Sequence, residues 1–72
     1  MRKMKEFVLI FDLPEKSHSD YVKVWRDLNK NNAKKIQQSV WKSEKLKELI
    51  DIATFIKKSG GHAIILEEKL IF

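Results

Sequence analysis

The sequence predicts a small α+β domain in which two amphipathic helices alternate with short strands in the order β-α-β-β-α-β. Three observations support this prediction. An apolar run at 7–11 is followed by Asp12 and Pro14. Two later segments place apolar residues at the helical spacings of three and four. Two glycines, Gly60 and Gly61, then precede a second apolar run at 63–66. A chain of 72 residues has room for one domain, which we assign to residues 1–72.

The first strand is predicted at residues 6–12. Its nearly continuous apolar sequence is typical of a central strand that is covered on both faces. Helices can cover one face, and in so short a chain a second copy would have to cover the other. Pro14 cannot continue the strand, so Asp12 is expected at a turn at the edge of the sheet. Ser17 or Ser19 can cap the helix that follows.

The first helix is predicted at 18–30, and Asn31 and Asn32 are expected to end it, because Asn tolerates the left-handed conformation. The residues that carry its apolar period are Tyr21, Val22, Val24, Trp25 and Leu28.

A second extended segment at 34–42 has no wholly apolar face as a single strand. A tight turn near Gln38 and Ser39 would divide it into two antiparallel strands and place both Ile36 and Trp41 in the core. Trp25 and Trp41 both fall on faces that we expect to pack inward, so we predict that they belong to the core and do not stack on bases.

The second helix is predicted to start after a capping Ser43 and to end at Gly60 and Gly61, with Lys57 and Lys58 near the negative end of its dipole. Phe55 is expected beside its buried stripe. That stripe is predicted to comprise Leu46, Leu49, Ile50, Ala53 and Ile56.

The last elements are predicted as a strand at 63–66, a turn at Glu67 and Glu68, and a short strand at 69–72. The complete order is that of a ferredoxin-like sandwich with a short C-terminal strand. So small a domain usually needs a disulfide, a metal or a partner for stability. The chain has no Cys and only two separated His, so we predict a homodimer.

Charge and composition limit the classes of function. The chain is 43% hydrophobic and 35% charged, with no stretch long enough to cross a bilayer, so we expect a cytoplasmic protein with no membrane partner. The net charge of +5 comes mainly from Lys, which suits phosphate contact better than base reading. Lys-rich surfaces that serve only solubility remain the alternative.

Two motifs, Phe11-Asp-Leu-Pro14 and Gln38-Ser-Val-Trp41, resemble the CRISPR-associated protein family "Cas two", the small partner of the CRISPR integrase in spacer acquisition. The resemblance covers almost the whole chain. The positions that match the family pattern are Phe11, Asp12, Leu13, Gln37, Ser39 and Val40, with Trp41 in place of a Phe.

Two related families share the pattern, namely the C-terminal domain of the phenylacetate repressors and the virulence-associated D ribonucleases. The sequence Phe11-Asp-Leu-Pro-Glu-Lys16 is more similar to the motif of the repressors than to that of the adaptation family. The repressors carry a winged helix, for which 72 residues leave no room, so we favour the adaptation family. The departures at 17–20 and at Asn32 affect the expected nucleic-acid contacts more than the fold.

The resemblance implies that Asp12 binds a metal and that two copies in a dimer share one Mg²⁺. The alternative is a structural Asp12 that accepts backbone hydrogen bonds in the turn. One carboxylate per chain is a weak metal site, so we favour a scaffold that binds duplex DNA and bridges integrase dimers. A Mg²⁺-dependent endonuclease acting on RNA or DNA, and a regulatory or toxin relative, are the alternatives. His18 and His62 lie far apart in the sequence and support no histidine-driven nuclease.

Candidate phosphate contacts are basic residues in three groups, and solvated lysines are the ordinary alternative for each group. The resemblance further implies that the C-terminal tail adds to the partner subunit's sheet. The candidate nucleic-acid residues are Arg2, Lys3, Lys5, Lys30, Lys34, Lys35, Lys42, Lys45 and Lys47, and the candidate dimer residues are Leu70, Ile71 and Phe72.

Overall fold

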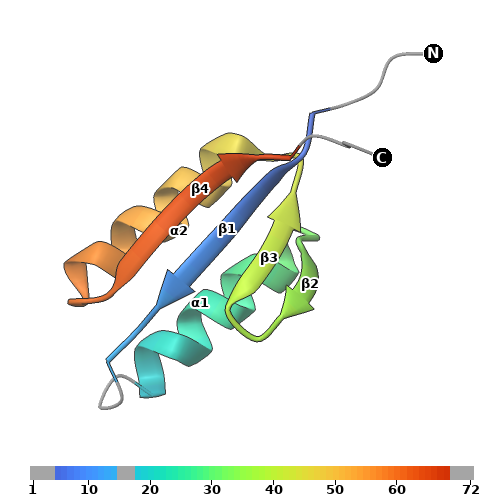
Figure 1. Cartoon of the computed structure of the whole chain (residues 1–72). Coiled ribbons are helices and arrows are strands. Elements are labelled where there is room, and N and C mark those ends of the chain that lie inside the picture. Colours follow the sequence, from blue (N-terminus) through green and yellow to red (C-terminus); the bar gives the residue numbers. More distant parts are fainter. Residues whose placement is uncertain (1–4, 15–17, 69–72) are drawn as a thin grey trace.

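The fold was obtained as a computed structural model, which describes residues 5–14 and 18–68 (Figure 1). Its element order is the predicted one. The elements are β1 (Phe7–Asp12), α1 (His18–Lys30), β2 (Lys34–Gln37), β3 (Val40–Ser43), α2 (Leu46–Lys58) and β4 (His62–Glu67). The predicted strand at 69–72, with Leu70, Ile71 and Phe72, lies outside the described residues.

The four strands form one sheet in the order β2-β3-β1-β4, and every neighbouring pair is antiparallel. Since β3 is antiparallel to both β1 and β2, these two run in the same direction with β3 between them, as a split βαβ unit requires. The predicted α+β class is thus confirmed, and the strand order is compatible with a ferredoxin-like sandwich.

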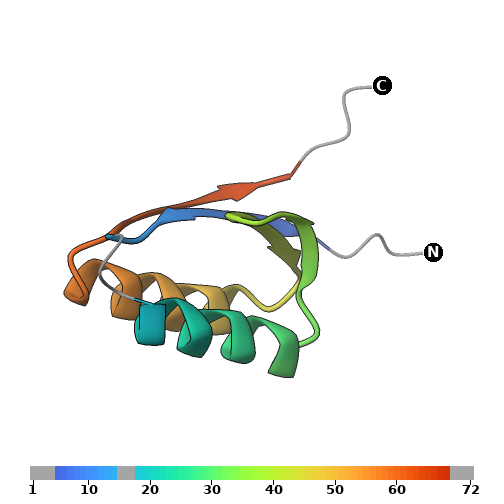
Figure 2. The ribbon, with the colours of Figure 1, turned by 90° about the horizontal axis from the view of Figure 1, so that it is seen from below.

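Both helices cover the same face of the sheet (Figure 2). Strand β1 alternates more strictly than its sequence suggests: Leu9 and Phe11 are buried against the helices, whereas Val8 and Ile10 lie on the other face. The core lies between the layers and comprises Leu9, Phe11, Val24, Leu28, Trp41, Leu49, Ile52, Ala53 and Ile56. Neither described helix has the length and apolar composition needed to cross a membrane.

Helix α1 has the predicted bounds, but its caps and apolar face differ in part from the prediction. Asn32 adopts φ 60°, and the Ala33 amide donates to the Leu28 carbonyl at 2.9 Å, so the predicted end of the helix is confirmed. Ser19 lies inside the helix, so it is not the N-cap, and Ser17 lies outside the described residues. Trp25 is 47% exposed, so its predicted burial is wrong.

The predicted division of residues 34–42 into two antiparallel strands is confirmed, with the turn at Gln38 and Ser39. Trp41 is buried as expected. Ile36 is half-exposed, so the second half of that prediction is wrong. The reason is an irregularity in the β2–β3 pairing between Lys35 and Gln37, which interrupts the alternation of faces at Ile36.

The start of α2 differs from the prediction, because Ser43 belongs to β3 and the helix begins two residues after Glu44. The Ser43 hydroxyl accepts a hydrogen bond from the Lys45 amide at 3.1 Å. Lys45 occupies the N-cap position with no side-chain cap, so the assignment of Ser43 as the cap is wrong. Ser43 instead fixes the link between β3 and α2.

The buried stripe of α2 is rotated from its predicted position. Its members are Leu49, Ile52, Ala53 and Ile56, at the helical spacings of three and four. Leu46 and Ile50, which the sequence prediction placed in the stripe, are 37% and 48% exposed. Two overlapping stripes satisfied the same spacing, and packing against the sheet selected the one containing Ile52.

The link from α2 to β4 confirms the prediction that the second helix ends at Gly60 and Gly61. Gly60 adopts φ 88°, where a side chain would be strained. A Cβ on Gly61 would collide with the Asp12 carbonyl, so the glycine allows the chain to pass directly beside the end of β1. The turn predicted at Glu67 is wrong, because Glu67 pairs with Phe7 and the ladder continues to the Glu68 amide, which donates to the Glu6 carbonyl at 2.9 Å.

Candidate functional site on the open face of the sheet

The face of the sheet that turns away from both helices (Figure 2) carries an apolar patch. Two cross-strand rows form it. Val8 lies between Lys42 and Leu66, and Ile10 lies between Val40 and Ile64. We call this surface the open sheet face, and its apolar residues are Val8, Ile10, Val40, Ile64 and Leu66.

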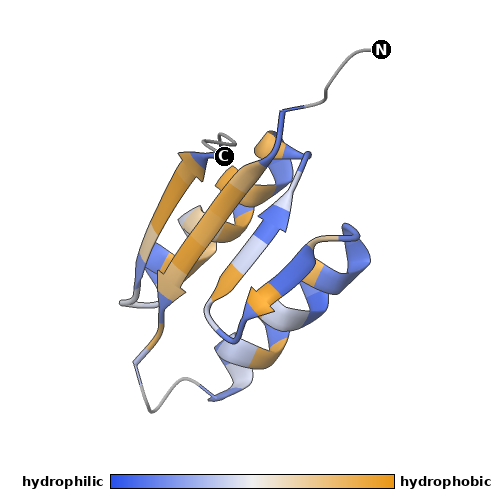
Figure 3. Cartoon of the chain, turned by 45° about the vertical axis from the view of Figure 1, so that its right-hand side comes forward, coloured by the Kyte–Doolittle hydropathy of each residue, from blue (hydrophilic) through white to orange (hydrophobic). Residues whose placement is uncertain are grey.

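Three of these aliphatic side chains are substantially exposed: Ile10 at 38%, Ile64 at 57% and Leu66 at 51%. They are neighbours on strands β1 and β4, where Figure 3 shows continuous hydrophobic colour. A contiguous patch of this kind is a typical mark of an interaction surface, whereas single exposed apolar residues are common.

Asp12 lies at one end of the open sheet face. It is the last residue of β1 and exposed, as the sequence predicted for a strand ended by Leu13 and Pro14. Its position in the alternation of β1 places it on the same face as Ile10. The amides at 15–17, which a turn-stabilising Asp12 would contact, lie outside the described residues.

Both histidines lie near Asp12, which the sequence did not indicate. His62 is its direct cross-strand neighbour in the β1–β4 register. His18 shares with Asp12 a hollow of about 360 Å³, whose wall includes Pro14 and Tyr21. The signal that could have found His62 was the glycine pair, which starts β4 opposite the end of β1.

The donor set around Asp12 is small for a metal centre. Among residues 5–14 and 18–68, no group of three or more His, Cys, Asp or Glu side chains is placed to hold a metal ion.

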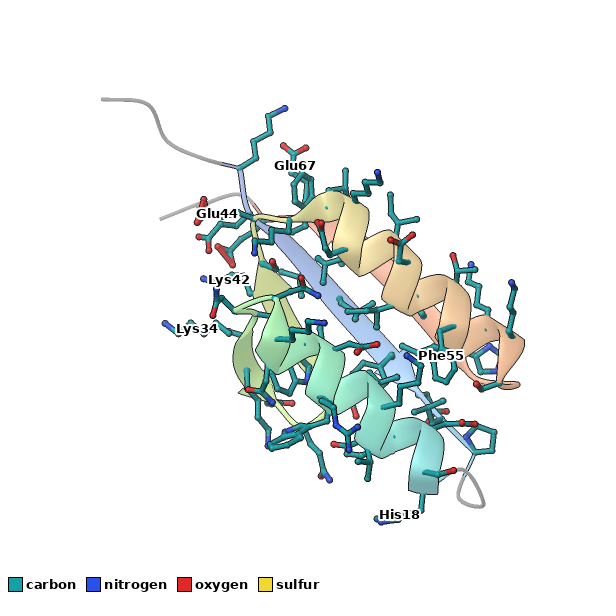
Figure 4. All side chains as sticks on the ribbon, turned by 180° about the vertical axis from the view of Figure 1, so that it is seen from behind. His18, Lys34, Lys42, Glu44, Phe55 and Glu67 are labelled. Atoms are coloured by element: carbon teal, nitrogen blue, oxygen red, sulfur yellow. The ribbon has the colours of Figure 1, made fainter. Side chains whose placement is uncertain are left out.

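Several of the predicted nucleic-acid residues that the structure describes lie toward the opposite end of the molecule, whereas Lys35 lines a hollow together with His18. Figure 4 shows Lys34 and Lys42 at this end and His18 at the other. Lys30 ends α1, while Lys45 and Lys47 flank the start of α2. The pairing of β2 with β3 places Lys34 directly opposite Lys42. Arg2 and Lys3 lie outside the described residues.

Carboxylates lie among these lysines. The Lys42 amine is 3.3 Å from a Glu68 carboxylate oxygen and 3.8 Å from one of Glu6, and its side chain is only 18% exposed. Lys5 lies 4.0 Å from Glu67. Lys42 is therefore engaged in holding β3, β1 and the end of β4 together. Of the predicted nucleic-acid residues, the exposed lysines for which no ion pair is found within the described residues are Lys30, Lys34, Lys35, Lys45 and Lys47.

A comparison of the sequence with models of protein families found no match, and a search of curated proteins found no significant relative.

Proposed function

We propose that this chain is a homodimeric scaffold that binds duplex DNA through phosphate contacts and bridges dimers of a CRISPR integrase during spacer acquisition. The CRISPR role follows from the motif resemblance at Phe11-Asp-Leu-Pro14 and Gln38-Ser-Val-Trp41. The single structural observation that supports the scaffold is the apolar open sheet face.

The occupant proposed for the open sheet face is a second copy of the chain. A domain of this length buries only about 60% of the surface of its unfolded chain, so it gains stability by covering further apolar surface. The patch lies on the central strand β1 and its neighbours, where a twofold partner would meet the same residues. Ile64 and Leu66 would become buried on dimerisation.

Duplex DNA would bind to Lys30, Lys34, Lys45 and Lys47, exposed lysines toward the end of the molecule opposite Asp12. These side chains come from the end of α1, from β2 and from the start of α2. Lysine contacts to phosphates position DNA without reading its sequence, as a subunit that accepts many spacers requires. Binding through several phosphates weakens steeply as salt rises.

An Asp12-centred endonuclease is the second candidate. The observation in its favour is that the Asp12 carboxylate is exposed, with His62 beside it across the ladder. In a dimer, two Asp12 carboxylates could hold one Mg²⁺, which would polarise a phosphodiester. We favour the scaffold because the described part of one chain supplies too few ligands for a metal centre of its own.

The deciding experiment uses Asp12→Ala in a reconstituted acquisition assay with the integrase and duplex DNA. We expect acquisition to remain within about twofold of the wild type, because the change removes no phosphate contact and leaves the apolar residues of the open sheet face in place. Any Mg²⁺-dependent cleavage of RNA or DNA should disappear. Lost acquisition in a variant with native circular dichroism would contradict the scaffold. Failure of the wild-type dimer to bind any integrase would favour the regulatory or toxin relative.

A further inference from the structure

A second surface, on the opposite side of the sheet from the open face, lies between α1 and the edge strand β2. It is a hollow of about 240 Å³. We call it the Trp25 hollow, and it is lined by His18, Tyr21, Val22, Trp25, Lys35 and Gln38.

The α1 residues of the hollow form one stripe, because positions 18, 21, 22 and 25 are spaced by three or four residues. Trp25 is 47% exposed in this stripe, whereas Trp41 is buried in the core. An indole that contributes little to the core but faces a hollow has its ring available for a ligand. The sequence pattern alone misplaced this residue inside.

The wall of the hollow is held in position by the β2–β3 turn. The Tyr21 hydroxyl donates a hydrogen bond to the Gln38 carbonyl at 3.2 Å, and the Trp41 indole nitrogen donates to the same carbonyl at 3.2 Å. One carbonyl therefore ties helix α1 and the core to the turn. A ligand would meet an arrangement that exists before binding, which reduces the entropy lost on association.

The polar groups of the hollow favour an anionic, planar ligand. Lys35 supplies a cation and Gln38 an amide, and among the described residues no carboxylate lines this hollow. An unpaired nucleobase can stack on an indole while its phosphate contacts a lysine. The volume is below the usual range for drug-sized ligands, which suits one base rather than a larger molecule.

A peptide strand added to β2 is disfavoured. The β2–β3 pairing is irregular between Lys35 and Gln37, and Lys34 and Lys35 lie on the edge strand itself. Irregular pairing and edge lysines are devices that oppose strand addition. The free edge therefore does not provide the regular ladder that a bound peptide would use.

The geometry points to the Trp25 hollow as a binding site for an unpaired base of single-stranded nucleic acid. This site goes beyond the proposed duplex scaffold, since its contact is base stacking and lies away from the open sheet face. It does not depend on dimerisation or on Asp12.

The test measures binding of fluorescein-labelled oligo(dT) and oligo(rU) of ten nucleotides, and of a blunt duplex, by anisotropy at fixed low salt. We expect Trp25→Ala to weaken binding of the single strands about tenfold, as loss of one stacked base predicts. Trp25→Phe, which keeps a ring, should stay within about threefold of the wild type. Ile50→Ala, a matched exposed apolar change on α2, should have no effect.

Intrinsic fluorescence gives an independent readout. Unlabelled oligo(dT) should quench part of the wild-type tryptophan emission, and that quenching should be absent in Trp25→Phe because only buried Trp41 remains. Either of two results would overturn the site: single strands that bind Trp25→Ala as tightly as the wild type, or no single-strand binding by the wild type at low salt.

The binding measurement with the blunt duplex distinguishes this proposal from the scaffold function. We expect Trp25→Ala to change duplex affinity by less than about twofold, since phosphate contacts do not involve the indole. Equal losses for single strands and duplex would contradict base stacking at Trp25. Lost duplex binding in the wild type, with single-strand binding intact, would contradict the scaffold and leave the Trp25 hollow supported.

Discussion

At the scale of single residues, the two tryptophans have opposite roles although the sequence placed both in the core. Trp41 is 1% exposed and donates its indole N–H to the Gln38 carbonyl, whereas Trp25 is 47% exposed on α1. Burial of a large aromatic ring is a major contribution to the stability of so small a core. The stability of this domain should therefore depend on Trp41 and hardly on Trp25.

We predict that Trp41→Phe lowers the free energy of unfolding by about 1–3 kcal/mol, because it removes a partly buried hydrogen bond and leaves a cavity. Trp25→Phe is the matched control and should change it by less than about 0.5 kcal/mol. Urea titration followed by circular dichroism, at one protein concentration, measures both. Similar losses in the two variants would contradict the burial difference.

Asp12 and His62, also at the scale of single residues, differ in whether their positions could be predicted from the sequence. The carboxylate at the end of β1 was predictable, because an apolar run that meets Asp12 and Pro14 marks a strand end. The neighbouring imidazole was not predictable, because its position depends on the pairing of β1 with β4. Register is a property of the folded sheet, and a shift of one residue would move His62 to the other face.

At the scale of elements, the helix and strand order followed from periodicity and from residues that end elements. Asn32, with φ 60°, and Gly60, with φ 88°, end the two helices where the sequence predicted. The rotation of α2 did not follow, because Ile50 and Ile52 compete for one apolar stripe. The exposure of Ile36 was also not predicted, because the alternation of apolar and polar residues in the sequence does not indicate an irregular strand pairing.

The end of α1 provides a test of this account of helix termination. Asn32→Ala should lower the free energy of unfolding by about 1 kcal/mol, because alanine is strained in the left-handed conformation that Asn tolerates. Asn32→Gly is the matched control and should leave stability unchanged or raise it slightly. Thermal denaturation followed by circular dichroism distinguishes the two. An alanine variant as stable as the glycine variant would contradict the assigned backbone conformation.

At the scale of the whole molecule, the two layers leave one face of the sheet uncovered by any described residue (Figure 2). The helices bury Leu9 and Trp41, while Ile10, Ile64 and Leu66 remain substantially exposed on the other side. Lys34 lies toward the end of this body opposite His18 and Asp12 (Figure 4). A twofold dimer through the open sheet face would cover the apolar patch while leaving the α1 and α2 lysines exposed.

The central claim is therefore that the open sheet face is buried between two copies. Sedimentation velocity at micromolar concentration tests it with two matched exposed isoleucines, Ile64 on the open sheet face and Ile50 on α2. We predict that the wild type and Ile50→Lys sediment at twice the chain mass of 8.5 kDa, and that Ile64→Lys sediments as a folded monomer. A wild type that is monomeric with native circular dichroism, or an Ile64→Lys variant that remains dimeric, would contradict the account.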